Sequence, residues 1–370
     1  RFGIFKICFK KMKNYAFHKK NFKYACILTT GRTGSDYLQG CLDGVPGIIT
    51  FSGEVPFYKF IKQSKVQSFL RNREYNNLIK LFIKKHYNLF YKDKLENKEL
   101  NINKNRFIKI FLNLSLKKNL DQKIFLKNVY LAYHLTLKRK ILKSNTIVHH
   151  SHHVKETESF IKDFKNTKIL ITIRDPRANL KSGIQNWFNY DKKKKSLEHS
   201  YLYLRRIHDD FSYALKKKNK YFVRLEDMQH AIKKRKILNF LSVKFSNKVN
   251  LSTFADKIWK GDKLSKFNIR DGKFNKANLN NNWKFFFSET DLRILNFLYY
   301  DYKKQGYFFE KIKFGKKLLI PFLFFLPFKY EKKLFMEIIF FKKSFIFSIK
   351  SIYFYLRKIL FLYKIYFQRI

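Results

Sequence analysis

The sequence predicts an α/β protein with a mainly parallel sheet flanked by helices. Two segments carry this prediction, residues 25–38 and 168–183, because each has an apolar run, then a polar turn, then a helical pattern. In an open α/β sheet such turns lie at the carboxyl ends of the strands, where ligands bind. One turn is rich in glycine and the other in arginine. Together they predict a site for a nucleotide that carries phosphates at two separate places.

The first turn has the composition of an anion-binding loop. Gly31 and Gly34 permit positive φ and let backbone N–H groups approach an anion closely. The helix expected to begin near Ser35 adds the positive end of its dipole, and Arg32 adds a charged, planar fork. A Gly-Lys-Ser/Thr ending is absent, so the loop is P-loop-like without being a Walker A motif. The alternative is an ordinary strand-to-helix turn with Ser35 as its N-cap.

The second turn strengthens the first interpretation. Residues 169–173 form a β-branched apolar run, and Pro176 stands where the first turn of a helix accepts proline. Ser182 follows Arg174 at the strand end by about two helical turns, so both side chains can face the same anion. The alternative, a surface ion pair between Arg174 and Asp175, is common but leaves the first loop unexplained.

These two motifs resemble those of the sulfotransferases that use 3′-phosphoadenosine 5′-phosphosulfate (PAPS). The similarity lies in the loop Gly31-Arg32-Thr33-Gly34-Ser35 and in Arg174-Asp175-Pro176-Arg177 followed by Ser182. It extends in layout over residues 22–310, and the arginine in the loop resembles the carbohydrate-type and bacterial branch. The resemblance implies PAPS as the sulfuryl donor.

The resemblance also implies roles for individual residues. A first group would hold the 5′-phosphosulfate, Arg174 and Ser182 would hold the 3′-phosphate, and a basic lid would add Arg270 and Lys273. The first group comprises Arg32, Thr33, Gly34, Ser35, Asp36 and Tyr37. Asp36 departs from the serine or threonine usual in the family, and a carboxylate beside a dianion is repulsive unless it points away or accepts backbone N–H groups.

Sulfuryl transfer requires a general base and a cationic clamp, and no metal ion is needed in principle. We expect Arg32 to stabilise the sulfuryl oxygens. Glu54 is the first candidate for the base, because it follows a strand-like run at residues 47–53 and the resemblance places a glutamate there. The alternative is a surface glutamate at the turn before Pro56.

A cluster of histidines at residues 149–153 offers a second candidate base. Histidine is the usual base near neutral pH, and a strand end would aim His150 or His152 at the acceptor. A metal site is disfavoured, since no cysteine pair has metal-binding spacing and adjacent strand residues point to opposite faces. A structural role in capping the helix expected near Val154 remains the alternative.

The chain divides into three zones. Residues 1–22 are a basic lead-in, and residues 23–310 form the presumed catalytic domain, with a helical insertion at 58–142 that would build the acceptor pocket. Residues 315–370 form a basic, aromatic, amphipathic tail. Its apolar run at 318–328 is too short to span a bilayer. We expect the tail to lie on an anionic membrane surface, the alternative being a helical hairpin packed on the domain.

Composition limits the partners. The net charge of +53 is partly the bias of a Lys- and Asn-rich composition, but it suits PAPS, acidic glycans or an anionic membrane. No zinc-finger or RRM-like signature supports specific nucleic-acid binding. The three cysteines form no disulfide framework, which indicates a reducing compartment. We therefore expect a cytoplasmic protein, peripheral on the inner face of the membrane.

The sequence thus predicts transfer of a sulfuryl group from PAPS to a hydroxyl of a carbohydrate or glycolipid. Two rivals remain, a nucleotide-dependent transferase such as a kinase and a non-enzymatic basic protein that binds nucleic acid or membrane. The sequence leaves the identity of the acceptor and the oligomeric state open.

Overall fold

The computed structural model describes residues 21–91, 100, 102–116, 119–190, 196–261, 271–279, 282–310, 314–340 and 343–369. The chain forms two compact units, to which non-contiguous segments contribute. The first unit contains residues 1–28, 36–170 and 230–274, and the second contains residues 29–35, 171–229 and 275–370.

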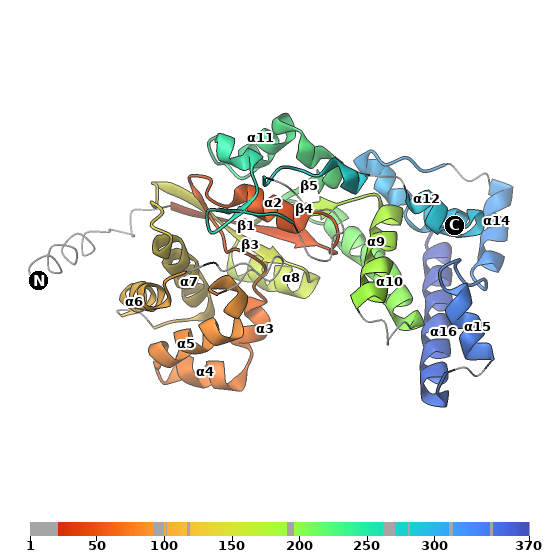
Figure 1. Ribbon diagram of the computed structural model, residues 1–370, viewed down its shortest axis with the longest axis horizontal. Helices are drawn as coiled ribbons and strands as arrows, with labels where there is room; N and C mark the ends of the chain where they lie inside the picture. Colours follow the sequence, from red (N-terminus) through yellow and green to blue (C-terminus); the bar gives the residue numbers. More distant parts are fainter. Residues whose placement is uncertain are drawn as a thin grey trace, which may run out of the picture. The chain divides into compact units, whose positions relative to one another are not determined.

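A five-stranded sheet with the order β2-β3-β1-β4-β5 organises the fold (Figure 1). Its strands are β1 (Asn21–Thr29), β2 (Ile48–Ile49), β3 (Ser144–Ser151), β4 (Lys168–Ile173) and β5 (Lys220–Arg224). β1 runs parallel to β3, with Ala25 opposite Val148, and β2 also pairs parallel with β3. The interiors of β1 and β4 are buried, as their continuous apolar runs predict for strands covered on both faces. The predicted α/β fold is confirmed.

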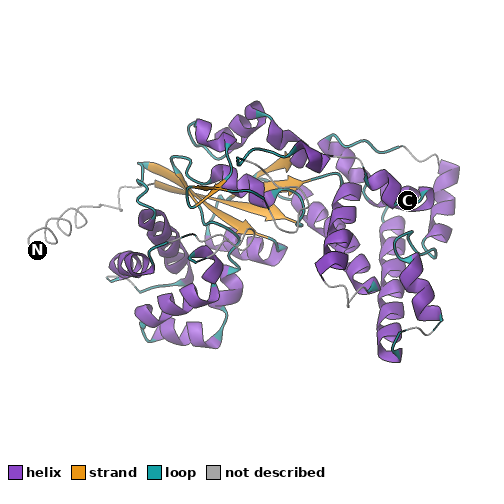
Figure 2. Cartoon of the chain, in the orientation of Figure 1, coloured by secondary structure: helices purple, strands orange, loops and turns teal. Residues whose placement is uncertain are grey.

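Helices dominate the rest of the first unit (Figure 2). The segment expected as a helical insertion contains a cluster of helices whose aromatic residues, Phe82, Phe107, Phe111 and Phe125 among them, are fully buried. The elements of this unit are α2 (Ser35–Leu42), α3 (Phe57–Ile61), α4 (Ser64–Arg71), α5 (Tyr75–Lys85), η2 (Tyr87–Leu89), α6 (Lys104–Ser115), α7 (Gln122–Thr136), α8 (Val154–Asp163), α11 (Ala231–Phe240), η4 (Asn247–Asn250) and the hairpin β6 (Thr253–Phe254) and β7 (Lys257–Ile258).

The second unit is built from long helices that follow the arginine-rich turn. Pro176 begins its first helix, as predicted, and β5 is followed directly by a 3-10 helix. The elements are α9 (Pro176–Tyr190), α10 (Leu197–Leu215), η3 (Leu225–Gln229), η5 (Lys276–Leu279), α12 (Trp283–Phe286), α13 (Glu289–Leu298), η6 (Tyr300–Gln305), α14 (Phe314–Leu323), α15 (Lys332–Ile339) and α16 (Phe345–Phe367).

The tail belongs to this second unit. One face of α16 packs on α10, where Phe361 makes an edge contact with the ring of Tyr201 and Ile359, Leu362 and Ile365 are buried. The opposite face leaves large apolar side chains exposed, including Ile349, Leu356 and Leu360. Within the described residues, no helix is both long enough and apolar enough to cross a bilayer.

A buried ion pair within the tail joins α16 to Glu331, the residue that precedes α15. Lys358 on α16 donates to the carboxylate of Glu331, and their side chains are 2% and 1% exposed. The same carboxylate accepts from the backbone N–H of Phe328 at 2.9 Å and from the hydroxyl of Ser200 on α10. The charge of Glu331 is therefore compensated by a cation and by two further donors, as a buried carboxylate requires.

We expect Lys358→Ala to lower the free energy of unfolding by about 3–5 kcal/mol, because the substitution leaves Glu331 buried without its cation. Urea denaturation measures the change. As a control, Arg293→Ala breaks an exposed pair with Glu289 and should cost about 1 kcal/mol or less. Equal effects of the two substitutions would contradict the structural role given to the buried pair.

Candidate functional site

The glycine-rich turn after β1 adopts a left-handed backbone at three positions. Gly31, Arg32 and Gly34 have φ of 86°, 57° and 81°. Glycine suits the positive φ at position 34, and a β-carbon there would lie 2.5 Å from Cδ1 of Leu225 and would displace that side chain. Arg32 is a non-glycine residue held at positive φ, a conformation that persists only where surrounding contacts impose it.

Hydrogen bonds among threonine hydroxyls hold the loop in this conformation. The hydroxyl of Thr33 lies 2.7 Å from that of Thr29, at the end of β1, and 2.7 Å from that of Thr172, in β4. The backbone N–H of Gly31 donates to the Thr29 hydroxyl at 2.9 Å. All three threonines are buried, so water does not compete for these bonds. The loop is thus fastened at both of its ends.

A second set of hydrogen bonds holds the loop from the side of α9 and α10. The Tyr203 hydroxyl lies 2.9 Å from Oδ1 of Asn179 and 3.2 Å from the carbonyl oxygen of Gly31. The Asn179 amide in turn donates to the Thr30 hydroxyl at 3.0 Å. A β-carbon on Gly183 would lie 2.0 Å from the Tyr203 ring, so this glycine makes room for the tyrosine. Burial raises the pKa of Tyr203 to about 12, which keeps the phenol protonated as a donor.

Sequence reasoning missed Asn179, Gly183 and Tyr203. The only signal was position, since Asn179 and Gly183 lie on the same predicted helix as Ser182. No signal in the sequence pointed to Tyr203, because it belongs to a separate helix that carries neither motif.

The structure brings together the cations expected at the two ends of the nucleotide. Nε of Arg32 donates to the hydroxyl of Ser182 at 3.3 Å. Burial lowers the pKa of Arg174, and the positive charge of Arg32 lowers it further. The carboxylates of Glu226 and Asp175 act in the opposite direction and raise it. Arg32 and Ser182 are thus in contact, and Arg174 lies close enough to Arg32 for its pKa to respond to that charge.

Lys181 adds a third positive charge. Burial lowers its pKa, and the charge of Arg174 acts in the same direction. Like charges in one place repel each other, and an anion bound among them would remove that repulsion. The arrangement therefore favours a multiply charged anionic ligand.

The second arginine of the Arg-Asp-Pro-Arg motif has a structural role. Arg177 is 7% exposed, pairs with the Asp175 carboxylate at 2.7 Å and lies over the rings of Trp283 and Phe309. Asp175 also accepts from the backbone N–H of Arg177 at 2.9 Å, which satisfies a free donor in the first turn of α9. Its carboxylate thus orients Arg177 and the helix start.

Two of the residues expected to hold the phosphosulfate belong to the first unit. Tyr37 is buried, its ring makes an edge contact with Phe274 at 5.4 Å, and its hydroxyl accepts from Lys234 at 3.2 Å. Burial raises its pKa far above the ordinary value, so its ring serves as core. Asp36 lies in the first turn of α2 with its side chain 30% exposed, and Oδ1 is 3.9 Å from Nδ1 of His150.

The structure also determines which ring nitrogen of His150 carries the proton. The side-chain NH₂ of Gln39 donates to the carbonyl oxygens of Phe51, at 2.9 Å, and Gly53, at 3.0 Å. This fixes Oε1 of Gln39 toward Nδ1 of His150, 2.8 Å away, so Nδ1 must be the donor. Nε2 then carries a lone pair, and it has no hydrogen-bond partner. Burial, with contributions from His152 and His149, lowers the pKa of His150 well below 6.5 and keeps it neutral.

Glu54 lies beside this histidine cluster. Its Oε1 accepts from the backbone N–H of His152 at 3.1 Å, and its Oε2 lies 3.8 Å from Nε2 of the same residue. The Glu54 side chain is 29% exposed, whereas that of His150 is fully buried. Glu54 is therefore the more accessible of the two candidate bases.

The remaining histidines of the cluster have other surroundings. His149 stacks on Phe160 and shares a hydrogen bond of 2.9 Å with the Tyr130 hydroxyl, and burial lowers its pKa to about 3. His153 precedes α8 without a side-chain capping bond. Of the expected lid, Arg270 lies outside the described residues, and Lys273 is exposed in the first unit.

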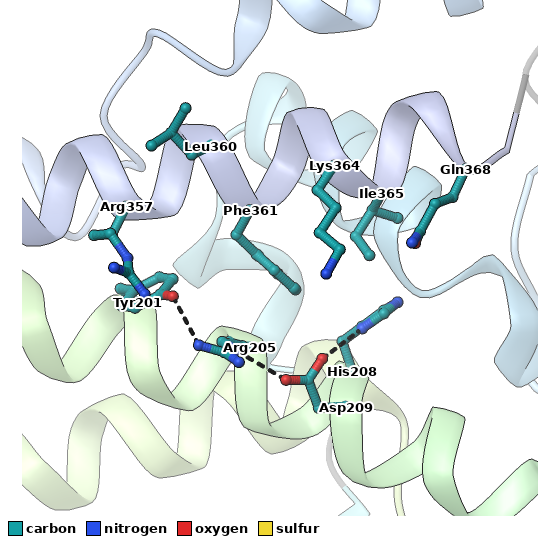
Figure 3. A pocket seen from close by; sticks show the side chains of 10 residues that line it. All are labelled: Tyr201, Arg205, His208, Asp209, Arg357, Leu360, Phe361, Lys364, Ile365 and Gln368. Atoms are coloured by element: carbon teal, nitrogen blue, oxygen red, sulfur yellow. Dashed lines mark hydrogen bonds and ion pairs between the residues drawn. The ribbon is translucent and has the colours of Figure 1, made fainter.

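A separate groove lies between α10 and α16, with a cavity volume of about 460 Å³ (Figure 3). Arg205, Arg357 and Lys364 supply positive charge there, and the Asp209 carboxylate is held by Arg205 at 2.9 Å. The lining residues are Tyr201, Arg205, His208, Asp209, Arg357, Leu360, Phe361, Lys364, Ile365 and Gln368. The groove contains none of the residues expected to bind the nucleotide.

No family model and no curated protein matches the chain. Among solved structures, similar chains include the sulfotransferase domain of the olefin synthase of Synechococcus PCC 7002, with 14% identity and a TM-score of 0.46 over 79% of this chain and 97% of that one. The sulfotransferase domain from the curacin biosynthetic pathway has 13% identity and a TM-score of 0.47 over 79% of this chain and 100% of that one. Sulfotransferase STF9 from Mycobacterium avium has 11% identity and a TM-score of 0.36, over 65% of this chain and 69% of that one. We base the assignment of function on the residues of the site.

We expect Tyr203→Phe to lower the free energy of unfolding by about 1–3 kcal/mol, because it leaves Oδ1 of Asn179 without its buried donor. Guanidinium titration measures the loss. Tyr353→Phe is the matched control, since that hydroxyl is on an exposed residue of α16 and its removal should cost under about 0.5 kcal/mol. A loss no larger than the control's would refute the role of Tyr203 in holding the loop.

Proposed function

We propose that the protein transfers a sulfuryl group from PAPS to a hydroxyl group of an acceptor. The observation that carries the proposal is the convergence of Arg32, Arg174 and Ser182 within one unit, beside a loop held by buried hydroxyls. The sequence motifs predict the same residues as the two ends of a nucleotide clamp.

PAPS matches this site in charge. Arg32, the hydroxyls of Thr33 and Ser35 and the backbone of Gly34 would hold the phosphosulfate at the start of α2, with Asp36 and Tyr37 extending the loop into that helix. Arg174 and Ser182 would hold the 3′-phosphate. The repulsion between Arg32 and Arg174 is then offset by an anion at each end of the ligand. Arg270 and Lys273 remain our candidates for a lid over the nucleotide.

The reaction needs one proton acceptor and one charge stabiliser. The acceptor oxygen attacks sulfur, the bond from sulfur to the 5′-phosphate oxygen breaks, and 3′-phosphoadenosine 5′-phosphate (PAP) leaves. The proton passes from the acceptor hydroxyl to the base. We assign the base to Glu54, because its carboxylate is partly exposed, and retain His150 as the alternative. Arg32 would stabilise the charge on the sulfuryl oxygens.

A carbohydrate or glycolipid is the acceptor that we propose. Its support is the net charge of +53, which attracts acidic glycans and anionic lipid surfaces. The acceptor pocket would be built by the helices of residues 58–142, next in sequence to Glu54.

The exposed face of α16 supports attachment to a membrane surface. Large apolar side chains line it, while Lys350 and Arg357 on the same helix are also exposed. Such a helix lies in the interface with its cations toward anionic lipid. The groove of Figure 3 adds Arg205 and Lys364, which suit phosphate groups of lipids. A cytoplasmic enzyme, peripheral on the inner face of the membrane, is the resulting proposal.

Calorimetric titration with PAP tests the donor site. We expect PAP to bind more tightly than 5′-AMP or ATP, and Arg174→Ala or Ser182→Ala to remove that preference. Loss of a charged hydrogen-bonding partner should weaken PAP binding roughly 10- to 100-fold. Arg293→Ala removes an exposed cation of the same unit and should leave binding unchanged. Equal, salt-sensitive binding of all three nucleotides would refute the sulfotransferase proposal.

Vesicle sedimentation tests the membrane surface. We expect binding to vesicles containing phosphatidylserine, and a roughly 10-fold or greater loss when Phe345, Ile349 and Leu356 are replaced together by serine, because that change removes apolar contact area. The control replaces Phe285, Ile232 and Leu116, which are exposed elsewhere, and should bind as the parent does. Unchanged binding by the α16 variant would exclude this face.

A further inference from the structure

One cluster of side chains is not explained by donor binding. Asp36, His150 and His152 each have one potential metal-ligating atom, and these three atoms lie within 4.8 Å of one another. Three atoms so arranged share a point within about 2.8 Å of each, whereas zinc binds nitrogen and carboxylate oxygen at about 2.0–2.2 Å. Side-chain movements below about 1 Å would therefore bring the three atoms to bonding distance.

The backbone explains why these residues meet. His150 and His152 are two positions apart at the end of β3, so their side chains share a face, and their ring centroids are 4.9 Å apart. Asp36 comes from the first turn of α2 and completes the group of three. It is the one residue of the loop that departs from the pattern expected for phosphosulfate binding.

The surroundings of His150 suit a metal ligand. Its side chain is 1% exposed, and its Nδ1 is hydrogen-bonded to Oε1 of Gln39. The lone pair of Nε2 is buried without a hydrogen-bond partner, which is unfavourable unless a ligand satisfies it. Ligating histidines commonly donate their other N–H to an oxygen acceptor in this way, so Gln39 occupies the position of an outer-shell partner.

We propose that Asp36, His150 and His152 form a binding site for a zinc-type divalent transition-metal ion. Two imidazoles and one carboxylate suit zinc and its neighbours, whereas magnesium and calcium prefer oxygen ligands alone. Three protein ligands leave one coordination position open. The ion would tie the start of α2 to the end of β3 within the first unit. The site shares Asp36 and His150 with the sulfuryl-transfer proposal, but that proposal needs no metal and Glu54 is its first candidate for the base.

Titration of the full chain with Co²⁺ tests the site, because cobalt in a low-coordinate nitrogen and oxygen site absorbs visible light. We expect one equivalent to bind with saturable absorption, and Zn²⁺ to displace it. Asp36→Asn and His152→Gln should each weaken Co²⁺ binding roughly 100-fold, since each removes a ligand. Gln39→Met should weaken it roughly 10- to 100-fold by releasing the orientation of His150.

The control is His208→Gln, which removes a histidine that also lies beside an aspartate, Asp209, but in the other unit. Its Co²⁺ affinity should equal that of the parent. Thermal melting without metal checks that each variant is folded. If one of the two ligand variants does not fold, the other still tests the site. No saturable absorption, or parent-like affinity in Asp36→Asn and His152→Gln, would overturn the proposal. PAP binding measured with a chelator present reports separately on the donor site.

Discussion

The hydroxyl of Thr33 is the contact on which the candidate donor site depends most. It bonds at once to Thr29, where β1 ends, and to Thr172, near the end of β4. A loop with three residues at positive φ would be costly to hold by backbone preference alone. Buried hydroxyl bonds from two strands, together with the Tyr203–Asn179–Thr30 chain, supply the restraint. Anion-binding N–H groups are useful only when they are held in place before the ligand arrives.

The charges of the second unit are held together against their own repulsion. The charge of Arg32 contributes to lowering the pKa of Arg174, and the charge of Arg174 contributes to lowering that of Lys181, so the scaffold keeps like charges close. Arg177 belongs to that scaffold, because it is enclosed by Asp175, Trp283 and Phe309. Of the two arginines in this four-residue motif, Arg177 stabilises the start of α9, and Arg174 is the one that we propose to bind an anion. Concentrated positive charge is favourable only when an anion is bound.

The structure bears on the packed interpretation of the tail, whereas binding to a membrane surface stays a proposal. The hydrogen bond from Ser200 on α10 to Glu331, and the packing of α16 on α10, make the tail part of the second unit. The opposite face of the same helix keeps Ile349, Leu356 and Leu360 in solvent. A helix of 23 residues has enough surface to pack on one side and present an apolar stripe on the other. Packing and surface binding are therefore compatible properties of one helix.

The sequence by itself determined the local features: the buried strands, the glycine loop, Pro176 at the start of α9, and Arg174 and Ser182 two turns apart. These follow from periodicity and from single-residue backbone preferences, which act over a few residues. Only the tertiary structure decided that Arg32 reaches Ser182, 150 positions away, and that Tyr203 holds the loop. The same is true of Gln39, whose amide selects the tautomer of His150 across 111 positions. Such contacts arise from the order of the strands and the packing of helices upon them, and no local pattern encodes which distant partner a side chain meets.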